Sequence, residues 1–282
     1  NLNPGRLGAS LFSVGDLFSR LKQYKSDIGI KKKFFFVKVD VQAAYDNIPP
    51  AAVFKLISNI VTKNKYRISR HTEITPGENY RSDSSSRPTK RWKSQTFFAD
   101  DPVKFPDTLT GSLMPGKKNT IFVENSTKKL CSRNDLLYLL DQHLRFNLVK
   151  IRNNYYRQKN GIPQGSVLSS LMCNFFYADL ESTHLSFLSP EESLLLRLTD
   201  DFLLITTNYL HAEQFLQIMH KGIPSYGLKV SPQKSLVNFE AKFNGNPLPQ
   251  VQFGQTAFPY CGCAIDTKNL DISRDWQRRE EL

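Results

Sequence analysis

The sequence predicts a mixed α/β fold with an antiparallel sheet backed by helices. Three observations support this prediction. Residues 31–41 are rich in Phe and Val, as buried strands are. In residues 194–207 two apolar runs flank Asp200 and Asp201, a pattern typical of an antiparallel hairpin. In residues 132–146 leucines recur at helical spacing.

Composition indicates a basic chain that is long enough to bury a core. Its 282 residues contain 38 Lys+Arg and 26 Asp+Glu, a net charge of +12. Such an excess attracts polyanions, of which nucleic acid is the commonest. Charge that only aids solubility is the alternative. No apolar run reaches the roughly 18 residues of a membrane span, so we expect no membrane partner.

Cysteine usage and the two ends of the chain lead to further expectations. Four Cys are too few and too unevenly spaced for a disulfide framework, which favours a reducing compartment. Cys261 and Cys263 lack a second pair at zinc spacing, so we expect no zinc site. The chain opens without Met and closes on a charged stretch, and we expect it to be a fragment of a longer protein.

The first predicted strand, 31–41, carries a candidate functional residue. Alternation places Val37, Val39 and Val41 on one face and Lys38 with Asp40 on the other. A helix should follow, with Asp46 or Asn47 as its N-cap and two prolines at its start. Its apolar stripe consists of Val53, Leu56, Ile57 and Ile60.

Residues 61–130 change in character and predict a large, partly structured insertion. We expect its Ser-rich part, 81–93, to be a loop. A helix over 132–146 follows, where Ser132 and Asp135 have capping-box spacing. A basic, aromatic turn then leads into a helix that starts near residue 166.

Three further elements are predicted toward the C-terminus. A short helix should end at Gly222, the usual helix stop. Residues 228–239 indicate a strand, a turn and a second strand. Residues 258–272 indicate a hairpin with its turn near Asp266 to Asn269.

The sequence contains two Asp-Asp pairs, and only one suits a hairpin. We expect Asp200 and Asp201 in a four-residue loop, from Thr199 to Phe202. Asp100 and Asp101 precede two prolines, which remove the hydrogen-bond donors that a returning strand needs. We therefore interpret that second pair as a solvated turn within the insertion.

Paired carboxylates at a buried tip need a cation. At about 4 Å, like charges repel by about 4 kcal/mol at an effective dielectric near 20. Oxygen ligands of this kind suit Mg²⁺. Asp40 is the candidate third carboxylate, with helix capping as its alternative role. Three Asp residues holding two metals ~3.5–4 Å apart form the usual apparatus of nucleotidyl transfer.

Five segments, in this order, resemble the palm motifs of reverse transcriptases, and most closely those of telomerase reverse transcriptases of fungal or yeast-like type. They are FFFVKVDVQAAYDNIPP (motif A), NGIPQGSVLSSLMCNFFYADLE (B′), LLLRLTDDFLLITT (C), GIPSYGLKVSPQKSLVNF (D) and FPYCGCAIDTKNLDI (E). PGRLGASLFSVGDLF resembles the segment before motif A. A long insertion between motifs A and B′ is also typical of telomerases. The resemblance covers nearly all of the chain outside residues 61–130.

The resemblance implies a right-hand polymerase palm and an order of domains. The expected parts are a fingers and palm lead-in (1–33), the motif A palm (34–60), an insertion in the fingers (61–130), the remaining palm (131–263) and the start of a thumb (264–282). It also implies that the catalytic pair is Asp200 and Asp201, because Asp100 and Asp101 precede motif B′.

The resemblance further implies residue roles. Asp40, Asp200 and Asp201 would hold two Mg²⁺ ions, with the Val41 carbonyl as a further ligand. Lys234 would be a general acid for the pyrophosphate, although an exposed surface Lys is its alternative reading.

Three further residues would lie at the incoming nucleotide. Tyr45 would pack under the sugar, unless it is simply a core aromatic. Gln164 and Gly165 would lie close to template and nucleotide, where glycine permits close approach.

The remaining site residues and the partners also follow from the resemblance. Tyr260, Cys261 and Gly262 would form the primer grip. Basic aromatic segments 63–70 and 152–159 suit phosphates and bases, or simply a solvated face. Partners would be telomerase RNA, a telomeric single-stranded DNA primer, dNTPs and accessory telomerase proteins, in the nucleus at chromosome ends.

The resemblance therefore predicts an RNA-directed DNA polymerase. The family's motifs 1 and 2 lie upstream of this chain, so we expect these 282 residues alone to extend primers poorly or not at all. Two alternatives remain: a retroelement or group II intron-type reverse transcriptase, and a catalytically silent nucleic-acid-binding palm scaffold.

Overall fold

A computed structural model describes residues 4–28, 32–76, 87–101, 105–109, 113, 117–251 and 255–275. The chain divides into two compact units. The insertion unit comprises Ile57–His143, and the palm unit comprises Leu2–Leu56 with Leu144–Leu282.

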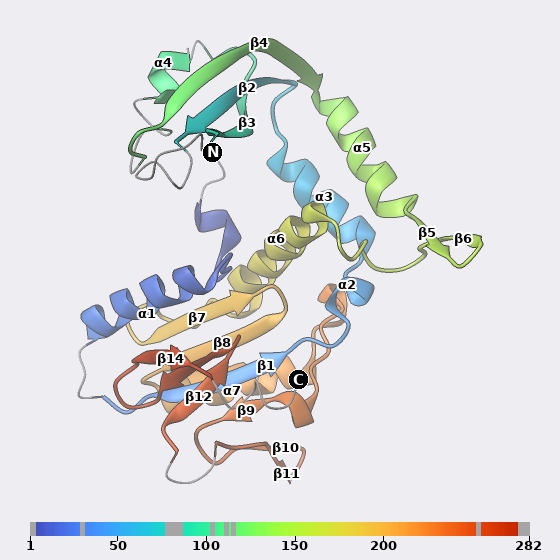
Figure 1. The fold of residues 1–282 in the computed structure, drawn as a ribbon. Helices are drawn as coiled ribbons and strands as arrows, with labels where there is room; N and C mark the ends of the chain where they lie inside the picture. Colours follow the sequence, from blue (N-terminus) through green and yellow to red (C-terminus); the bar gives the residue numbers. More distant parts are fainter. Residues whose placement is uncertain are drawn as a thin grey trace. The chain divides into compact units, whose positions relative to one another are not determined.

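A four-stranded antiparallel sheet of order β7-β8-β1-β9 lies at the centre of the palm unit (Figure 1). The strands are β1 (Phe35–Asp40), β7 (Ser193–Leu198), β8 (Asp201–Thr206) and β9 (Leu236–Val237). The strand predicted over residues 31–41 is therefore confirmed for residues 35–40. Its pairing with β8 sets Asp40 opposite Asp201, so the two acidic motifs meet at one end of the sheet.

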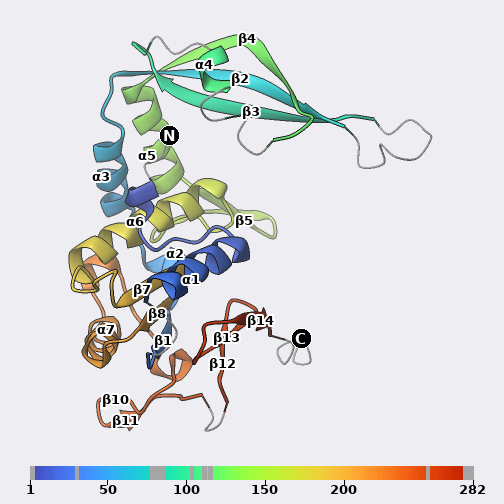
Figure 2. The same cartoon turned by 90° about the vertical axis from the view of Figure 1, so that its left-hand side faces the viewer.

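Both faces of this sheet are covered, as Figure 2 shows with the strands nearly edge-on. The covering elements are α1 (Val14–Ile28), α6 (Val167–His184), α7 (Tyr209–Lys221), β12 (Ala257–Tyr260), β13 (Cys263–Asp266) and β14 (Ile272–Arg274). Phe202 of β8 packs against Tyr177 of α6, while Phe36 of β1 packs against Phe258 of β12. Because side chains alternate along a strand, Asp40 lies on the face of Phe36, toward β12.

Shorter elements complete the palm unit. They are η1 (Pro4–Leu7), α2 (Ala44–Asn47), β5 (Leu148–Ile151), β6 (Asn154–Arg157), η3 (Pro224–Tyr226), η4 (Pro232–Lys234), β10 (Lys242–Phe243) and β11 (Asn246–Pro247). Helix α3 (Pro50–Ile60) begins here and starts at a proline, as expected. Asp46 and Asn47 lie inside α2, so the prediction that one of them caps α3 is wrong. The missed one-turn helix α2 intervenes between β1 and α3.

The insertion unit contains a three-stranded antiparallel sheet of order β3-β2-β4. Its elements are β2 (Lys65–Thr75), β3 (Thr89–Phe98), α4 (Phe105–Thr108), β4 (Ile121–Ser132) and α5 (Arg133–Arg145), the last of which continues into the palm unit. The predicted loop over 81–93 is wrong for residues 89–93, which open β3; residues 81–86 lie outside the described part. The polar side chains of β3 are compatible with its place at the edge of the sheet, where they face solvent. Ser132 does cap α5, since its Oγ accepts from the Asp135 N–H at 3.1 Å.

The C-terminal predictions are partly confirmed. Helix α7 ends at Gly222, where φ is 75°. Residues 228–239 contain one strand, β9, after the 3-10 helix η4, and the predicted first strand is reduced to isolated bridges at Leu228 and Val230. Residues 258–272 form two turns instead of one. The unpredicted turn is Cys261–Gly262, between β12 and β13. No helix in the described part of the chain is long and apolar enough to cross a membrane.

Candidate catalytic site

The hairpin of β7 and β8 presents the central Asp pair. Leu198 is the register partner of Asp201, so only Thr199 and Asp200 form the turn. The predicted four-residue loop is therefore wrong, because Asp201 and Phe202 already belong to the ladder. Thr199 has φ 60°, a conformation that β-branched residues rarely adopt and that costs on the order of 1–3 kcal/mol. Strain is thus localised beside the Asp pair.

The carboxylates of Asp40, Asp200 and Asp201 lie at the same end of the palm sheet, where β1 ends and β8 begins. Asp40 and Asp201 are register partners on neighbouring strands. The Val41 N–H donates to the Asp200 carbonyl at 3.3 Å, which ties the turn to the end of β1. Burial raises the pKa of Asp200, and the negative charges of Asp201 and Asp40 raise it further. The three groups therefore influence one another electrostatically.

The residues of this site fit a divalent cation in donor type. All three side chains offer hard carboxylate oxygens, the ligands that Mg²⁺ prefers. Asp200 is partly desolvated and repelled by its neighbours, a situation that a cation relieves. Among the described residues, no three His, Cys, Asp or Glu side chains converge closely enough to enclose an ion. The evidence that these three residues suit a divalent cation is therefore the type of their donor atoms and the mutual repulsion of their negative charges.

Lys234 of η4 supplies a positive charge at the site. Its Nζ lies 3.2 Å from Oδ2 of Asp40. The Lys234 side chain is 67% exposed, whereas that of Asp40 is 24% exposed. Its ammonium can therefore reach both the acidic cluster and a molecule bound beside it.

Tyr45 lies in α2 next to the carboxylates. Its hydroxyl is 3.4 Å from Oγ of Ser170 in α6. Burial raises the pKa of Tyr45, and the charge of Asp200 contributes to the increase. Its backbone is held as well, because the Ile162 N–H donates to the Tyr45 carbonyl at 2.7 Å. The GIPQGS segment therefore packs directly on the residue predicted to touch the sugar.

The glycines of that segment differ in their surroundings. Gly161 has φ 73°, and a Cβ there would lie 2.3 Å from the Tyr45 carbonyl oxygen. Gly165 has φ 87° and open space where its Cβ would be. Gln164 is exposed beside it. The close approach within the protein thus occurs at Gly161, which sequence reasoning did not single out, while Gln164 and Gly165 form an open surface.

The predicted primer grip divides into a buried and an accessible part. Tyr260 is fully buried, and its hydroxyl donates to the Asp201 carbonyl at 2.9 Å. Cys261 is half-buried and Gly262 is exposed, with φ 77°. Burial and the charge of Asp201 raise the pKa of Cys261 to about 11, so the thiol is not a ready nucleophile. Of these three residues, only Cys261 and Gly262 in the turn are accessible to a partner.

Arg197 is a residue that sequence reasoning missed. It is fully buried, its Nε lies 2.6 Å from Oε1 of Glu181, and its guanidinium also donates to Asn174, Ser10 and the Thr199 carbonyl. The network joins β7 to α6 and to the chain before α1. An Arg inside the apolar run LLLRL was the available signal, since a buried charge must be paired.

The other Asp-Asp pair lies in the insertion unit. Asp100 is exposed in a turn after β3, and the Asp101 carbonyl accepts from Arg67 at 2.9 Å. Both carboxylates lie outside the palm sheet. Their place agrees with the prediction of a solvated turn.

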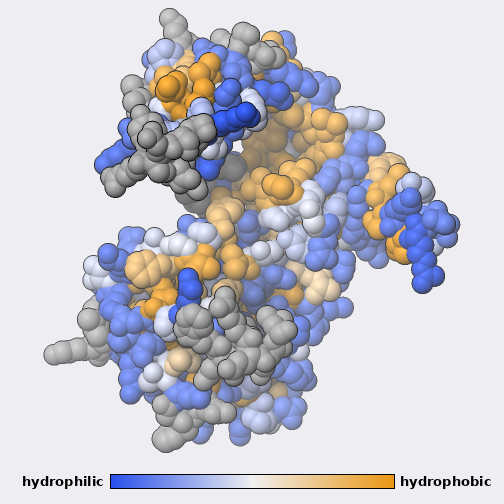
Figure 3. Space-filling view, viewed as in Figure 1, coloured by the Kyte–Doolittle hydropathy of each residue, from blue (hydrophilic) through white to orange (hydrophobic). Residues whose placement is uncertain are grey.

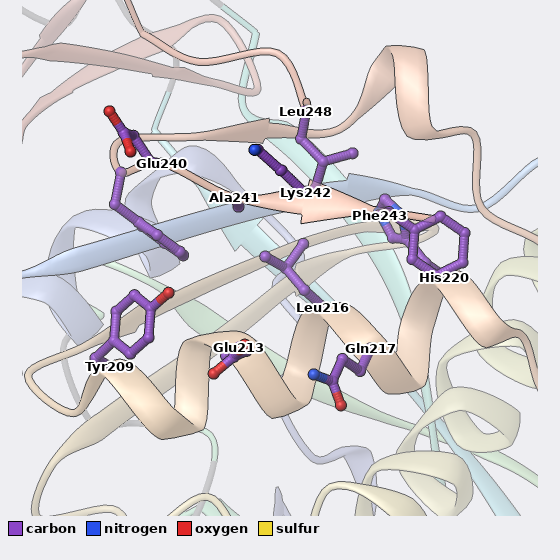
Figure 4. Close-up of a pocket in the computed structure, with 11 residues that line it drawn as sticks. Tyr209, Glu213, Leu216, Gln217, His220, Glu240, Ala241, Lys242, Phe243 and Leu248 are labelled. Atoms are coloured by element: carbon purple, nitrogen blue, oxygen red, sulfur yellow. The ribbon is translucent and has the colours of Figure 1, made fainter. Parts of the chain in front are cut away.

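A pocket of about 280 Å³ occurs elsewhere in the palm unit, between α7 and the segment around β10 (Figure 4). Apolar side chains, including Leu216, Phe243 and Leu248, line it together with Glu213 and His220. None of the predicted site residues lines this pocket.

The β5–β6 hairpin is exposed along its whole length. Lys150 lies over the Tyr155 ring at 5.6 Å, and Arg157 lies over the Phe146 ring at 5.3 Å. Figure 3 shows this hairpin at the right as apolar side chains beside hydrophilic ones. Such pairs of cations and rings suit phosphates and bases.

Residues 123–265, just over half of the chain, match the family model "Reverse transcriptase (RNA-dependent DNA polymerase)". The chain belongs to this family. Within it, the chain resembles telomerase reverse transcriptases: that of Rattus norvegicus is 29% identical over 285 residues, which cover 97% of this chain and 25% of the relative. The chain therefore spans about a quarter of the length of the curated relatives it matches.

Two solved structures share the fold. Apo telomerase from Candida tropicalis has a TM-score of 0.64 at 20% identity, covering 96% of this chain and 38% of that one. Telomerase from Candida albicans in complex with the TWJ fragment of telomeric RNA has a TM-score of 0.63 at 21% identity, covering 97% and 36%. Both likenesses agree with a polymerase palm.

Proposed function

We propose that this chain is the palm and part of the fingers of a telomerase reverse transcriptase, which extends chromosome 3′ ends by copying an RNA template. The observation that carries the proposal is the meeting of Asp40 with Asp200 and Asp201 at one end of the palm sheet. The resemblance to telomerase reverse transcriptases over nearly the whole chain supports it.

The residues of the site have the following roles in this proposal. Asp40, Asp200 and Asp201, with the Val41 carbonyl, would hold two Mg²⁺ ions. When bound, the two ions activate the primer 3′-hydroxyl and neutralise charge on the triphosphate. Lys234 offers a proton to the pyrophosphate leaving oxygen.

Other residues position the substrates. Tyr45 packs against the sugar of the dNTP and excludes a 2′-hydroxyl. Gln164 and Gly165 border the template and the nucleotide, while Cys261 and Gly262 border the primer. The β5–β6 hairpin and the basic segment 63–70 contact nucleic acid through phosphates and stacked bases.

The proposal extends to partners and location. The Candida albicans relative has been solved with a telomeric RNA fragment. We infer that this protein likewise binds a telomerase RNA, a telomeric single-stranded DNA primer and accessory telomerase proteins, at telomeres in the nucleus.

Primer extension by the full-length protein, purified from its own cells, tests this function. We expect a telomeric primer and dNTPs to give products without an added template, and RNase to abolish them. Asp200→Ala should eliminate extension, whereas Asp100→Ala, in the other Asp pair, should retain it. Extension only with an external template would instead indicate a general reverse transcriptase. Nucleic-acid binding without any extension would indicate a silent scaffold.

A further inference from the structure

The hydroxyl of Tyr260 hydrogen-bonds to the backbone of the catalytic hairpin beside its turn. It accepts from the Leu198 N–H at 3.1 Å and donates to the Asp201 carbonyl at 2.9 Å. Leu198 and Asp201 are the register pair that closes the turn. Opposite residues beside a two-residue turn exchange backbone hydrogen bonds, so the Tyr260 hydroxyl adds a side-chain contact to both groups of this closing pair.

This side-chain contact is one of those that hold the Asp pair from outside the hairpin. The Asp200 carbonyl receives the Val41 N–H at 3.3 Å, and the Asp201 carbonyl receives the Tyr260 hydroxyl. Thr199, between the hairpin strands, has a strained φ of 60°. A strained turn persists only when its surroundings hold it, and the Tyr260 hydrogen bonds are part of that support.

The Tyr260 side chain is unsuited to a direct primer contact. Its exposed fraction is 0%, and its ring packs in the core between the palm sheet, α1 and β13. The accessible part of the β12–β13 hairpin is its turn, Cys261 and Gly262. The part of this hairpin that a primer can reach, Cys261 and Gly262, is therefore distinct from Tyr260, which contacts the catalytic hairpin.

We propose that Tyr260 is a positioning residue for the metal-binding carboxylates: its hydroxyl sets the backbone of Asp201 and, through the turn, of Asp200. This inference rests on the proposed function, because it assumes that these carboxylates bind divalent metal. In Tyr260→Phe the Leu198 N–H and the Asp201 carbonyl keep each other as ladder partners but lose the hydroxyl that ties both of them to the core. The closing pair is then held by the ladder alone, so the backbone of Asp201 beside the strained turn is less firmly positioned.

The chain offers a matched control in Tyr24. It is also buried, in the same core, and its hydroxyl also reaches backbone carbonyls of the palm unit, at Glu192 (2.7 Å) and Ile205 (3.3 Å). Ile205 lies at the far end of β8 from Asp201. Tyr24→Phe therefore removes a comparable hydroxyl without touching the hairpin turn.

Metal binding without catalysis is the primary measurement. Mn²⁺ binding to the full-length protein, freed of RNA, is followed by electron paramagnetic resonance, with Asp200→Asn defining the carboxylate-dependent fraction. We expect Tyr260→Phe to weaken that fraction about three- to tenfold, the scale of one lost hydrogen-bond partner. Tyr24→Phe should bind Mn²⁺ like the wild type, although both variants lose thermal stability.

Primer extension then separates positioning from primer contact. We expect Tyr260→Phe to raise the Mg²⁺ concentration for half-maximal rate and to leave the primer KM within about twofold, since no primer contact is lost. Unchanged Mn²⁺ binding with a raised primer KM would overturn the inference, and so would equal weakening in Tyr24→Phe. If wild type and Asp200→Asn bind Mn²⁺ equally, the proposed function itself fails.

Discussion

The ammonium of Lys234 lies 3.2 Å from a carboxylate oxygen of Asp40, although 194 positions separate the two residues in the chain. Val41, next to Asp40, forms a bridge with Val230, so the segment that carries Lys234 is attached at the end of β1. The cation is therefore held at the acidic site by the fold, while its side chain keeps the freedom of an exposed group.

Removal of Lys234 should slow chemistry more than binding. We expect Lys234→Ala to lower the rate of nucleotide addition by about 10²-fold, the lower range for a general acid, and Lys234→Arg to retain more of it. Rapid-quench single-nucleotide addition by the full-length enzyme measures this rate. Lys229→Ala, an exposed lysine on the same segment, is the control. If Lys234→Ala and Lys229→Ala lowered the rate equally, Lys234 would contribute only positive charge and not a proton.

Truncation of Arg197 should destabilise the palm unit. Arg197→Met leaves the buried Glu181 without its cation, and we expect a loss of about 3–5 kcal/mol in the free energy of unfolding. Denaturant unfolding of the protein measures it. Lys25→Met, which breaks the exposed Lys25–Asp271 pair, should cost below about 1 kcal/mol. A similar small loss for Arg197→Met would mean that its network contributes little.

The two glycines of the GIPQGS segment should respond differently to alanine. Gly161→Ala adds a Cβ at 2.3 Å from the Tyr45 carbonyl oxygen, so we expect loss of stability together with a raised KM for dNTPs. Gly165→Ala meets open space and should cost only the backbone strain, about 1–2 kcal/mol. Thermal unfolding and steady-state dNTP titrations on both variants give the comparison. Equal stability losses would contradict the clash at Gly161.

Acid should weaken the sheet of the insertion unit through Glu73. Burial alone raises the pKa of Glu73, but the hydrogen bond and charge of Lys117 and the charge of Lys93 outweigh it and leave the pKa below its usual 4.5. A lowered folded pKa means that the stabilisation is present above pH 4.5 and is lost as the pH falls through the folded value.

Hydrogen exchange of β2 amides, corrected for the intrinsic effect of pH, tests this dependence. We expect protection to fall below about pH 4.5 in the wild type, whereas Glu73→Gln should be less protected above that pH and its protection should vary less with pH. A wild-type profile as flat as that of Glu73→Gln would show that the two lysines do not stabilise the carboxylate.

Local patterns predicted many elements correctly. The strand ending at Asp40, the Ser132 cap of α5 and the Gly222 stop of α7 each depend on a few neighbouring residues. Strand β3 was missed because its residues are polar, and its pairing with β2 over ten positions supplies what its composition does not. The length of the Asp200 turn was missed because register depends on the partner strand.

The sequence by itself determined the order of the motifs, which Asp pair belongs to a hairpin, and where α5, α6 and α7 begin or end, because these signals are local. Only the tertiary structure decided that Tyr260 hydrogen-bonds to the catalytic hairpin and that Arg197 pairs with Glu181. It also decided that Gly161, and not Gly165, is the crowded glycine. Such contacts join residues far apart in the chain, so packing of the sheet between its two covering layers selects them, and no local pattern encodes the partner.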